Sequence, residues 1–250
     1  MQTLGKVILV IFFTFLTNIL PSQETISEND IEKYWGNLGD SSFKLNISGG
    51  LAWTEAHRLE SLIDMYEATG DNSFLKELVR RYDRIFANRD DKIGKIDEIR
   101  NRTMKGWGST EYTEGSWHVH AVHTGMILFP AMKFCVVVQS NPVLLAEFLP
   151  KVNEYLKYGI ESIHEFDEEW RDTLDEGYYV QATGYPGNKS GTVLPFNMGL
   201  AIGKAMLGIF HCTGDALIKE RITRLAKWFR NSLRLESGNL WTWDYKKGGG

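Results

Sequence analysis

A helical pattern recurs along this 250-residue chain and limits the folds that it can adopt. Between residues 51 and 88, apolar side chains return every three or four positions, which places them on one face of a helix. The pattern stops at Gly70, a residue type that ends helices, and Asp71 is suited to cap the helix that follows. Two helices joined by about three residues must lie antiparallel, so this segment predicts a helical hairpin. Its first stripe comprises Leu59, Leu62, Ile63 and Tyr66, and its second comprises Phe74, Leu75, Leu78, Val79, Tyr82, Ile85 and Phe86.

The hairpin pattern occurs two more times. Residues 206–233 repeat it with Asp215 in the turn, and residues 131–163 contain a weaker copy with Asn141 in the place of the turn aspartate. The turns are spaced by about 70 residues, which predicts repeated units that bury their faces against one another. No stretch alternates apolar and polar residues as a strand does. We therefore predict an all-α chain of repeated antiparallel helical hairpins.

The first 23 residues have the composition of a secretory signal peptide. Lys6 precedes an apolar run from Val7 to Phe13, and polar residues follow it. This run is too short to span a bilayer comfortably. We expect residues 1–23 to be removed and residues 24–250 to form one domain, secreted or periplasmic, without a membrane contact. A buried first helix and an uncleaved membrane anchor are the alternatives.

Charge and cysteine content narrow the class of function. The formal net charge of −4 at pH 7 provides no basic face, so we expect no nucleic-acid partner. Cys135 and Cys212 both lie within predicted helices, which is not the spacing of a disulfide framework. The sequence leaves open whether these two cysteines pair, and it leaves the oligomeric state open.

The connections between the hairpins carry most of the polar and aromatic signal. Residues 89–117, 165–195 and 236–250 should all emerge at the end of the helices opposite the tight turns. Long loops on one face of a rigid scaffold are where binding residues concentrate, and flat aromatic rings beside carboxylates suit sugar rings. We therefore predict an aromatic-lined mouth for an oligo- or polysaccharide. The alternative is that the same rings fill the end of the bundle and bind nothing. These aromatic residues are Trp107, Trp117, Trp170, Trp241 and Trp243, with Tyr112, Tyr178, Tyr179, Tyr185 and Tyr245.

Two turn sequences carry a resemblance to a known group of proteins. In residues 65–74 and 209–218, an aromatic residue precedes Thr-Gly-Asp and a second amphipathic helix, and Pro195-Phe196-Asn197 leads into another helix. The chain resembles the (α/α) toroid carbohydrate-active proteins, which include six-hairpin glycosidases, toroidal polysaccharide lyases and the helical domain of glucuronyl C5-epimerases. The resemblance implies a partial toroid over residues 50–250 and a sugar-binding role for Asn197. A closed ring needs about six hairpins, so we expect the domain to be incomplete at its C-terminus.

Three histidines gather where the first long loop meets a helix. His118, His120 and His123 could hold a metal, transfer protons or bind substrate, or pack structurally. Their spacing alone fixes no metal geometry, so we predict neither a metal nor a cofactor. We assign His118 to catalysis and His120 and His123 to substrate binding.

Carboxylates in the first two loops suggest hydrolysis of a glycosidic bond. That reaction needs one carboxylic acid to protonate the leaving oxygen and a second carboxylate to activate water or attack. We predict that Glu111 or Glu114 from the first loop pairs with Asp172 or Asp175 from the second. The leading prediction is accordingly a secreted glycoside hydrolase.

Two other functions remain open. A uronate lyase or C5-epimerase would use His118 or Tyr179 as base and the basic residues near Arg100 against the substrate carboxylate. The acidic second loop would repel a polyanion, which favours a neutral sugar. The third possibility is a carbohydrate-binding or helical-repeat interaction protein without activity.

Overall fold

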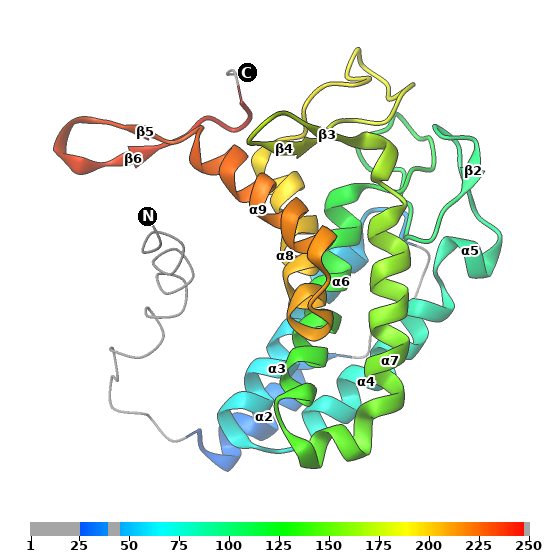
Figure 1. The fold of residues 1–250 in the computed structure, drawn as a ribbon. Helices are drawn as coiled ribbons and strands as arrows, with labels where there is room; N and C mark the ends of the chain where they lie inside the picture. The colour runs from blue at the N-terminus through cyan, green and yellow to red at the C-terminus, as the bar shows by residue number, and fades with distance from the viewer. Residues whose placement is uncertain (1–25, 40–45, 248–250) are drawn as a thin grey trace. The chain divides into compact units, whose positions relative to one another are not determined.

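The computed structural model describes residues 26–39 and 46–247 (Figure 1). The predicted leader, residues 1–23, lies outside the described residues. The chain divides into two compact units, residues 1–39 and 40–250. In the first unit, helix α2 (Glu28–Leu38) begins with a capping box, because Ser27 accepts a hydrogen bond from the Asp30 amide and Asp30 accepts one from the Ser27 amide.

The first predicted hairpin opens the second unit. A π-helical turn, η2 (Leu51–Glu55), runs directly into α3 (Ala56–Thr69), and α4 (Ser73–Ala87) follows. Gly70 ends α3 with φ +73°, a conformation that costs a glycine little. The Asp71 carboxylate accepts a hydrogen bond from the Ser73 amide at 2.8 Å, which satisfies a donor at the start of α4. The hairpin prediction is confirmed.

The other two predicted hairpins are also present. They consist of α6 (Ala121–Gln139) with α7 (Pro142–His164), and of α8 (Phe196–Thr213) with α9 (Ala216–Arg230). The Asn141 side chain accepts hydrogen bonds from the first amides of α7, and Asp215 does the same for α9. The described chain is therefore mostly helical, as predicted.

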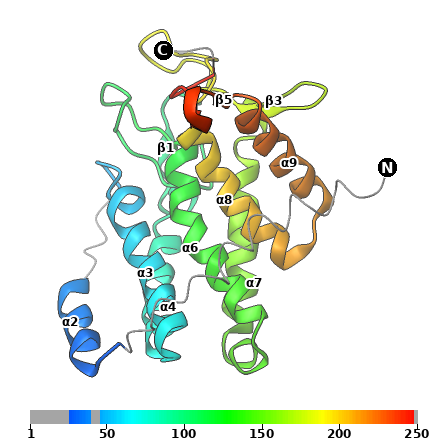
Figure 2. The same cartoon turned by 90° about the vertical axis from the view of Figure 1, so that its left-hand side faces the viewer.

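The core of the second unit is built around α6. Figure 2 shows α3, α6 and α8 side by side, and α6 also packs on its partner α7. Helices α6 and α8 approach so closely that a Cβ atom on Gly125 would lie 2.4 Å from the backbone of Ala201. Among the described helices, α6 is long and apolar enough to cross a membrane, but 72% of its apolar window is buried inside the protein. Cys135 on α6 is buried and Cys212 on α8 is half-buried, and both are free thiols.

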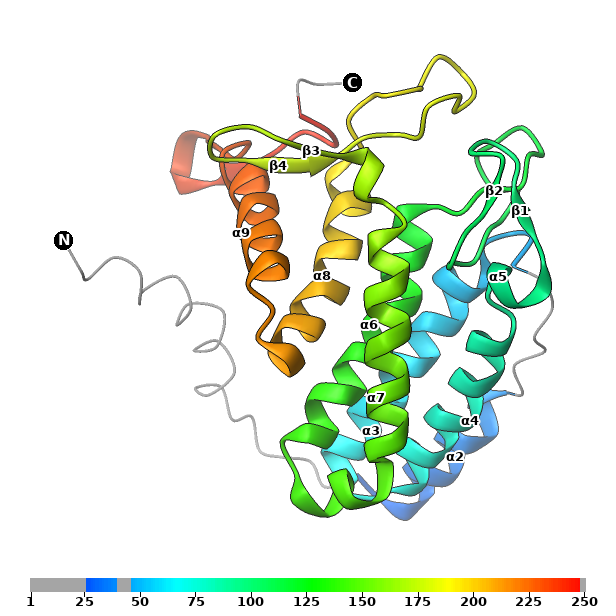
Figure 3. The ribbon, with the colours of Figure 1, turned by 45° about the vertical axis from the view of Figure 1, so that its right-hand side comes forward.

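Three short antiparallel ribbons occupy the long loops, although the sequence predicts no strands. They pair β1 (Ile96–Asp97) with β2 (Arg102–Thr103), β3 (Trp170–Asp172) with β4 (Gly177–Tyr179), and β5 (Arg234–Leu235) with β6 (Trp241–Thr242). Strands of two or three residues are too short to show an alternating pattern. The loops also contain the short helices α5 (Asp90–Ile93), η3 (Asp167–Glu169) and η4 (Ser237–Asn239). Figures 1 and 3 show all three ribbons at the end of the helices away from the tight turns.

Candidate active site

The three predicted histidines form a buried cluster at the start of α6. His118 pairs through its backbone with Ser109, and His120 is the extended residue that precedes the first helical residue. The side chains are almost completely enclosed, since His118, His120 and His123 are 2%, 6% and 0% exposed. Adjacent rings lie close together, with centroid distances of 4.7 Å for His118–His120 and 4.8 Å for His120–His123.

Asp97 holds the His118 ring in place. This carboxylate is fully buried at the end of β1, and its Oδ2 lies 3.0 Å from His118 Nδ1. It also accepts hydrogen bonds from the backbone amides of Ile99, Arg100 and Val119 and from the Arg100 guanidinium. A carboxylate with this many donors has little freedom to move, so it fixes the orientation of the imidazole.

The hydrogen bonds around Asp97 also assign the protons of His118. Arg100 Nη1 lies 3.1 Å from His118 Nδ1, but it donates to Asp97 Oδ2 at 2.6 Å and to the Val119 carbonyl at 3.2 Å. These two bonds account for both protons of Nη1. The proton between His118 and Asp97 is therefore carried by Nδ1, because an ionised carboxylate only accepts. In the neutral ring, Nε2 is left as a proton acceptor.

A bidentate ion pair connects this dyad to the second long loop. Arg100 Nε and Nη2 donate to the two oxygens of Glu169 at 2.7 and 2.8 Å, and both side chains are about nine-tenths buried. The planar guanidinium thus joins β1 and its turn to the segment before β3. Glu169 is committed to this pair and is not a free acid.

Burial sets the protonation of the cluster. It lowers the pKa of His118, an effect that the hydrogen bond to Asp97 partly offsets. Burial and the neighbouring imidazoles lower the pKa of His120 to about 2 and that of His123 to about 4. Burial alone would raise the pKa of Asp97, but the His118 hydrogen bond and the Arg100 charge hold it well below its usual range. At neutral pH the site contains three neutral imidazoles beside an ionised carboxylate.

A small cavity adjoins His118 and His120. Arg100 and Glu169 form part of its wall, Gln181, Tyr185 and neighbouring apolar residues of the second loop form another part, and apolar residues of α6 and α8 complete it. Its volume is about 20 Å³, which is room for about one water molecule. The Tyr185 ring lies with its centroid 5.2 Å from that of His118.

Two of the imidazoles have a nitrogen without a partner. The Nε2 atoms of His120 and His123 are buried and make no hydrogen bond in the described structure. His123 packs edge-on against Trp53 with a centroid distance of 5.2 Å, and a Cβ atom on Gly49 would lie 2.9 Å from its ring. His120 instead belongs to the cavity wall, where an unsatisfied nitrogen needs a water or a ligand atom as its partner.

The four carboxylates predicted to be catalytic fall into two separate groups. Glu111 is half-buried and Glu114 is exposed in the loop after Ser109. Asp172 and Asp175 are exposed on the β3–β4 hairpin and form ion pairs of 3.6 and 3.3 Å with basic residues of α9. Among the described residues, no hydrogen bond or ion pair links one group to the other, and none of the four lines the histidine cavity.

Two predicted sugar-binding tryptophans are buried. Trp107 is 1% exposed and donates its indole hydrogen to the Ile85 carbonyl at 2.8 Å. Trp117 is 4% exposed and donates to the Asp90 carboxylate at 2.8 Å. These rings fill the bundle end and fix the first loop to α4 and α5.

The remaining predicted binding residues are spread over the second unit. Tyr179 is fully buried beneath the half-buried Trp170, with a centroid distance of 5.0 Å. Trp241 and Trp243 are 56% and 54% exposed near the last ribbon. The structure places Tyr185, but none of the following, at the histidine cavity: Trp170, Tyr178, Tyr179, Asn197, Trp241 and Trp243.

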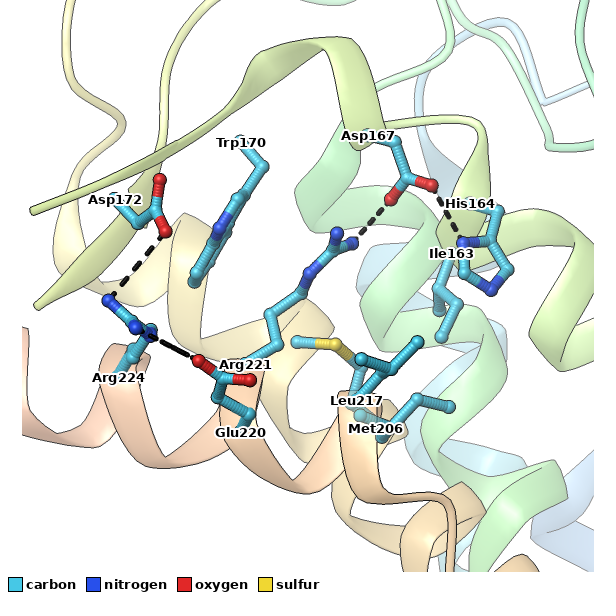
Figure 4. A pocket seen from close by; sticks show the side chains of 11 residues that line it. Ile163, His164, Asp167, Trp170, Asp172, Met206, Leu217, Glu220, Arg221 and Arg224 are labelled. Atoms are coloured by element: carbon cyan, nitrogen blue, oxygen red, sulfur yellow. Dashed lines mark hydrogen bonds and ion pairs between the residues drawn. The ribbon is translucent and has the colours of Figure 1, made fainter.

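A larger open groove lies between α7, β3 and α9 (Figure 4). Its volume is about 290 Å³ and its apolar lining comes from α7, α8 and α9. The charged side chains along it pair with one another, because Arg221 bonds Asp167, and Arg224 lies 2.9 Å from Glu220 and 3.6 Å from Asp172. These charges are already compensated, so we place the candidate site at the histidines.

Sequence reasoning missed Asp97 and the role of Glu169. Asp97 stands in a charged stretch of the first loop without a motif around it, and its histidine partner lies 21 residues further along the chain. Within the described ranges, no group of three His, Cys, Asp or Glu side chains is arranged to hold a metal ion. No protein-family model matches the chain, and no curated protein matches it in sequence. The function must therefore be argued from the geometry of this site.

Proposed function

We propose that this protein is a carbohydrate-active enzyme that transfers protons on a uronic acid sugar, as a lyase or C5-epimerase, on a partial (α/α) toroid. The observation that carries the proposal is the buried Asp97–His118 dyad in the wall of a cavity that also contains Tyr185. Three adjacent antiparallel hairpins support the toroid part of the proposal. The exposed aromatic rings of the third loop support a carbohydrate partner.

His118 is the base in this proposal. Its lowered pKa keeps the imidazole neutral at neutral pH. Asp97 binds Nδ1, so Nε2 is the nitrogen that accepts the proton. Tyr185 is the acid, since burial raises the pKa of its hydroxyl and keeps it protonated. A pair of titratable groups whose pKa values are pushed apart is the arrangement that acid–base catalysis requires.

The bonds that change follow from these two roles. His118 takes the proton from the sugar carbon beside the carboxylate, and the electron pair forms a carbon–carbon double bond as the glycosidic oxygen leaves. Tyr185 gives that oxygen its proton, so the reaction is an elimination without water. In an epimerase, a proton returns to the same carbon from the opposite face and the glycosidic bond stays intact.

Two side chains of the cavity wall, Gln181 and His120, are left to bind the substrate. The charge of Arg100 is already compensated, because four of its five N–H donors go to Asp97, Glu169 and a backbone carbonyl. The amide of Gln181 can donate a hydrogen bond to the carboxylate, and the unpartnered nitrogen of His120 can accept one from a sugar hydroxyl. We assign them to substrate binding.

This geometry supports proton abstraction better than hydrolysis by paired carboxylates. Asp97 is saturated with donors and Glu169 is held by Arg100, so the cavity wall offers no free acid. The carboxylates predicted for hydrolysis lie elsewhere in the second unit. The test below distinguishes hydrolysis, because hydrolysis gives reducing ends without unsaturation or exchange.

The test measures products from neutral and uronic oligosaccharides. We expect ultraviolet-absorbing unsaturated ends from a lyase, or deuterium uptake from heavy water into intact substrate from an epimerase. The variant His118→Asn should lower turnover by at least about 100-fold, the usual contribution of a general base. The matched control is His211→Asn, because His211 is exposed on α8 away from the cavity. Full activity of His118→Asn, or reducing ends without unsaturation or exchange, would refute the proposal.

A further inference from the structure

One loop of the chain contributes Gln181, Ala182 and Tyr185 to the wall of the cavity beside His118. This lid loop, residues 181–192, starts and ends at the bridge between Val180 and Val193. Most of its residues are exposed, but Tyr185 is only 5% exposed because its ring points inwards over the histidines. A cavity of about 20 Å³ holds a water molecule but not a sugar ring. A sugar can therefore reach His118 only after part of the cavity wall has moved, and this loop is a mostly exposed part of that wall.

The lid loop is held together mainly by its own hydrogen bonds. Gln181 N donates to the Thr192 carbonyl at 2.8 Å, and Gly191 N returns a bond to the Gln181 carbonyl at 3.1 Å. Near the tip, Gly184 N donates to Ser190 Oγ at 3.0 Å. These bonds lie within the loop, so its backbone can move as a unit without leaving them unsatisfied.

A single described hydrogen bond ties the lid loop to the opposite side of the site. The Tyr185 hydroxyl donates to the Tyr112 carbonyl at 3.2 Å. Tyr112 is 52% exposed and belongs to the first long loop. The remaining contacts of Tyr185 with the histidines are between ring edges and faces, and its ring lies 6.2 Å from that of His120. The contact that closes the site is consequently small, and it consists of this bond, the Tyr185 ring and the buried Ala182.

We propose that residues 181–192 form a lid that opens to admit the sugar and carries Tyr185 into the site when it closes. The base His118 stays fixed on the scaffold by Asp97, whereas the acid Tyr185 arrives with the lid. Closure would then complete the catalytic pair and exclude water in one step, which protects an elimination from competing hydrolysis. The assignment of Tyr185 as acid rests on the proposed function, but the movement of the lid does not.

The test measures how fast each histidine reacts with diethyl pyrocarbonate, which acylates accessible unprotonated imidazoles. Peptide mass spectrometry resolves the rates, and the exposed His57 and His211 serve as references within the same molecule. In the wild-type protein, His118 and His120 should react at least about tenfold more slowly than the references, because they react only through a minor open state. Their reaction should still go to completion, which shows that the lid opens.

Three variants test the lid itself. Tyr185→Ala should bring the rates of His118 and His120 to within about threefold of the reference rates, since the open state then dominates. Tyr185→Phe keeps the ring but loses the bond to the Tyr112 carbonyl, so it should give intermediate rates. Lys189→Ala, at an exposed position of the same loop, should leave the rates unchanged. If Tyr185→Ala unfolds, as judged by circular dichroism, Tyr185→Phe carries the test alone.

Two results would overturn the lid. In the first, His118 and His120 of the wild-type protein react as fast as His57, so that nothing covers them. In the second, the folded Tyr185 variants react as slowly as the wild type. Because the readout needs no turnover, an inactive protein with this pattern would refute only the proposed function. An active protein without the pattern would refute only the lid.

Discussion

A buried carboxylate beside the candidate site makes a sharp prediction about stability. Asp90 is 1% exposed at the start of α5, and its Oδ2 accepts hydrogen bonds from the Trp117 indole at 2.8 Å and the Gly108 amide at 3.0 Å. It forms no ion pair within the described residues. Burial therefore raises the pKa of Asp90 to about 6, against an ordinary value of 3.8.

The size and sign of the effect follow from proton linkage. A tenfold difference in acidity corresponds to about 1.4 kcal/mol, so a rise from 3.8 to about 6 corresponds to about 3 kcal/mol. The native state binds the proton more tightly than the unfolded state. The stability contribution is fully present below about pH 4 and is lost as the pH rises through about 6. At neutral pH the ionised, buried Asp90 thus destabilises the fold.

The variant Asp90→Asn should remove this cost without disturbing the contacts. Both hydrogen bonds go to one oxygen, so the single oxygen of an asparagine amide can accept them. We expect the free energy of unfolding to rise by up to about 3 kcal/mol at about pH 8 and by close to zero at about pH 4. Urea denaturation of both proteins at these pH values, followed by tryptophan fluorescence, measures the difference.

The matched control is Asp97→Asn, the same change at a buried carboxylate with the opposite environment. Asp97 faces Arg100 and His118, so removing its negative charge should destabilise the protein by roughly 3–5 kcal/mol at neutral pH. The reasoning would be refuted if Asp90→Asn destabilised the protein at about pH 8, or if its effect did not depend on pH.

Three further predictions follow from the packing, the caps and the histidines. Gly125→Ala should destabilise the fold by about 1–3 kcal/mol, because the new methyl group would meet the backbone of Ala201 on α8. Gly36→Ala has open space around it, so it should be neutral or stabilising by less than about 1 kcal/mol, and thermal unfolding compares the two variants. Asp215→Ala should cost about 0.5–2 kcal/mol in urea denaturation by removing the cap of α9. Since burial lowers the pKa of His123 to about 4, its imidazole resonances should not shift between about pH 7.5 and pH 5.5 in an NMR titration.

The candidate site was only partly predictable from the sequence. The spacing of His118, His120 and His123 marked a cluster, and the structure brings their rings together. The partner of His118 could not be found in the same way, because Asp97 lies 21 residues earlier in the chain. Likewise, Glu169 approaches Arg100 across 69 residues of chain, and no local pattern records such a contact.

The aromatic residues show the same limit. The sequence placed Trp107 and Trp117 in loops beside polar residues, which favoured a sugar-binding mouth and left a packed bundle end as the alternative. An indole ring can be buried when its N–H group has a hydrogen-bond acceptor inside the protein, and the Ile85 carbonyl and Asp90 are these acceptors. Tyr185 had the same sequence signal, but its loop places it over the histidine cavity.

The three hairpins could be predicted from the sequence, because helix periodicity, Gly70 and Gly214 in the turns, and the caps at Asn141 and Asp215 all act within a few residues of chain. The fold was needed to show which polar residues of the loops meet in a buried site and which stay in water. The physical reason is that the burial and the pairing of a side chain depend on groups that the fold brings together from distant segments. Burial and pairing then set the protonation of that side chain, which its residue type alone does not.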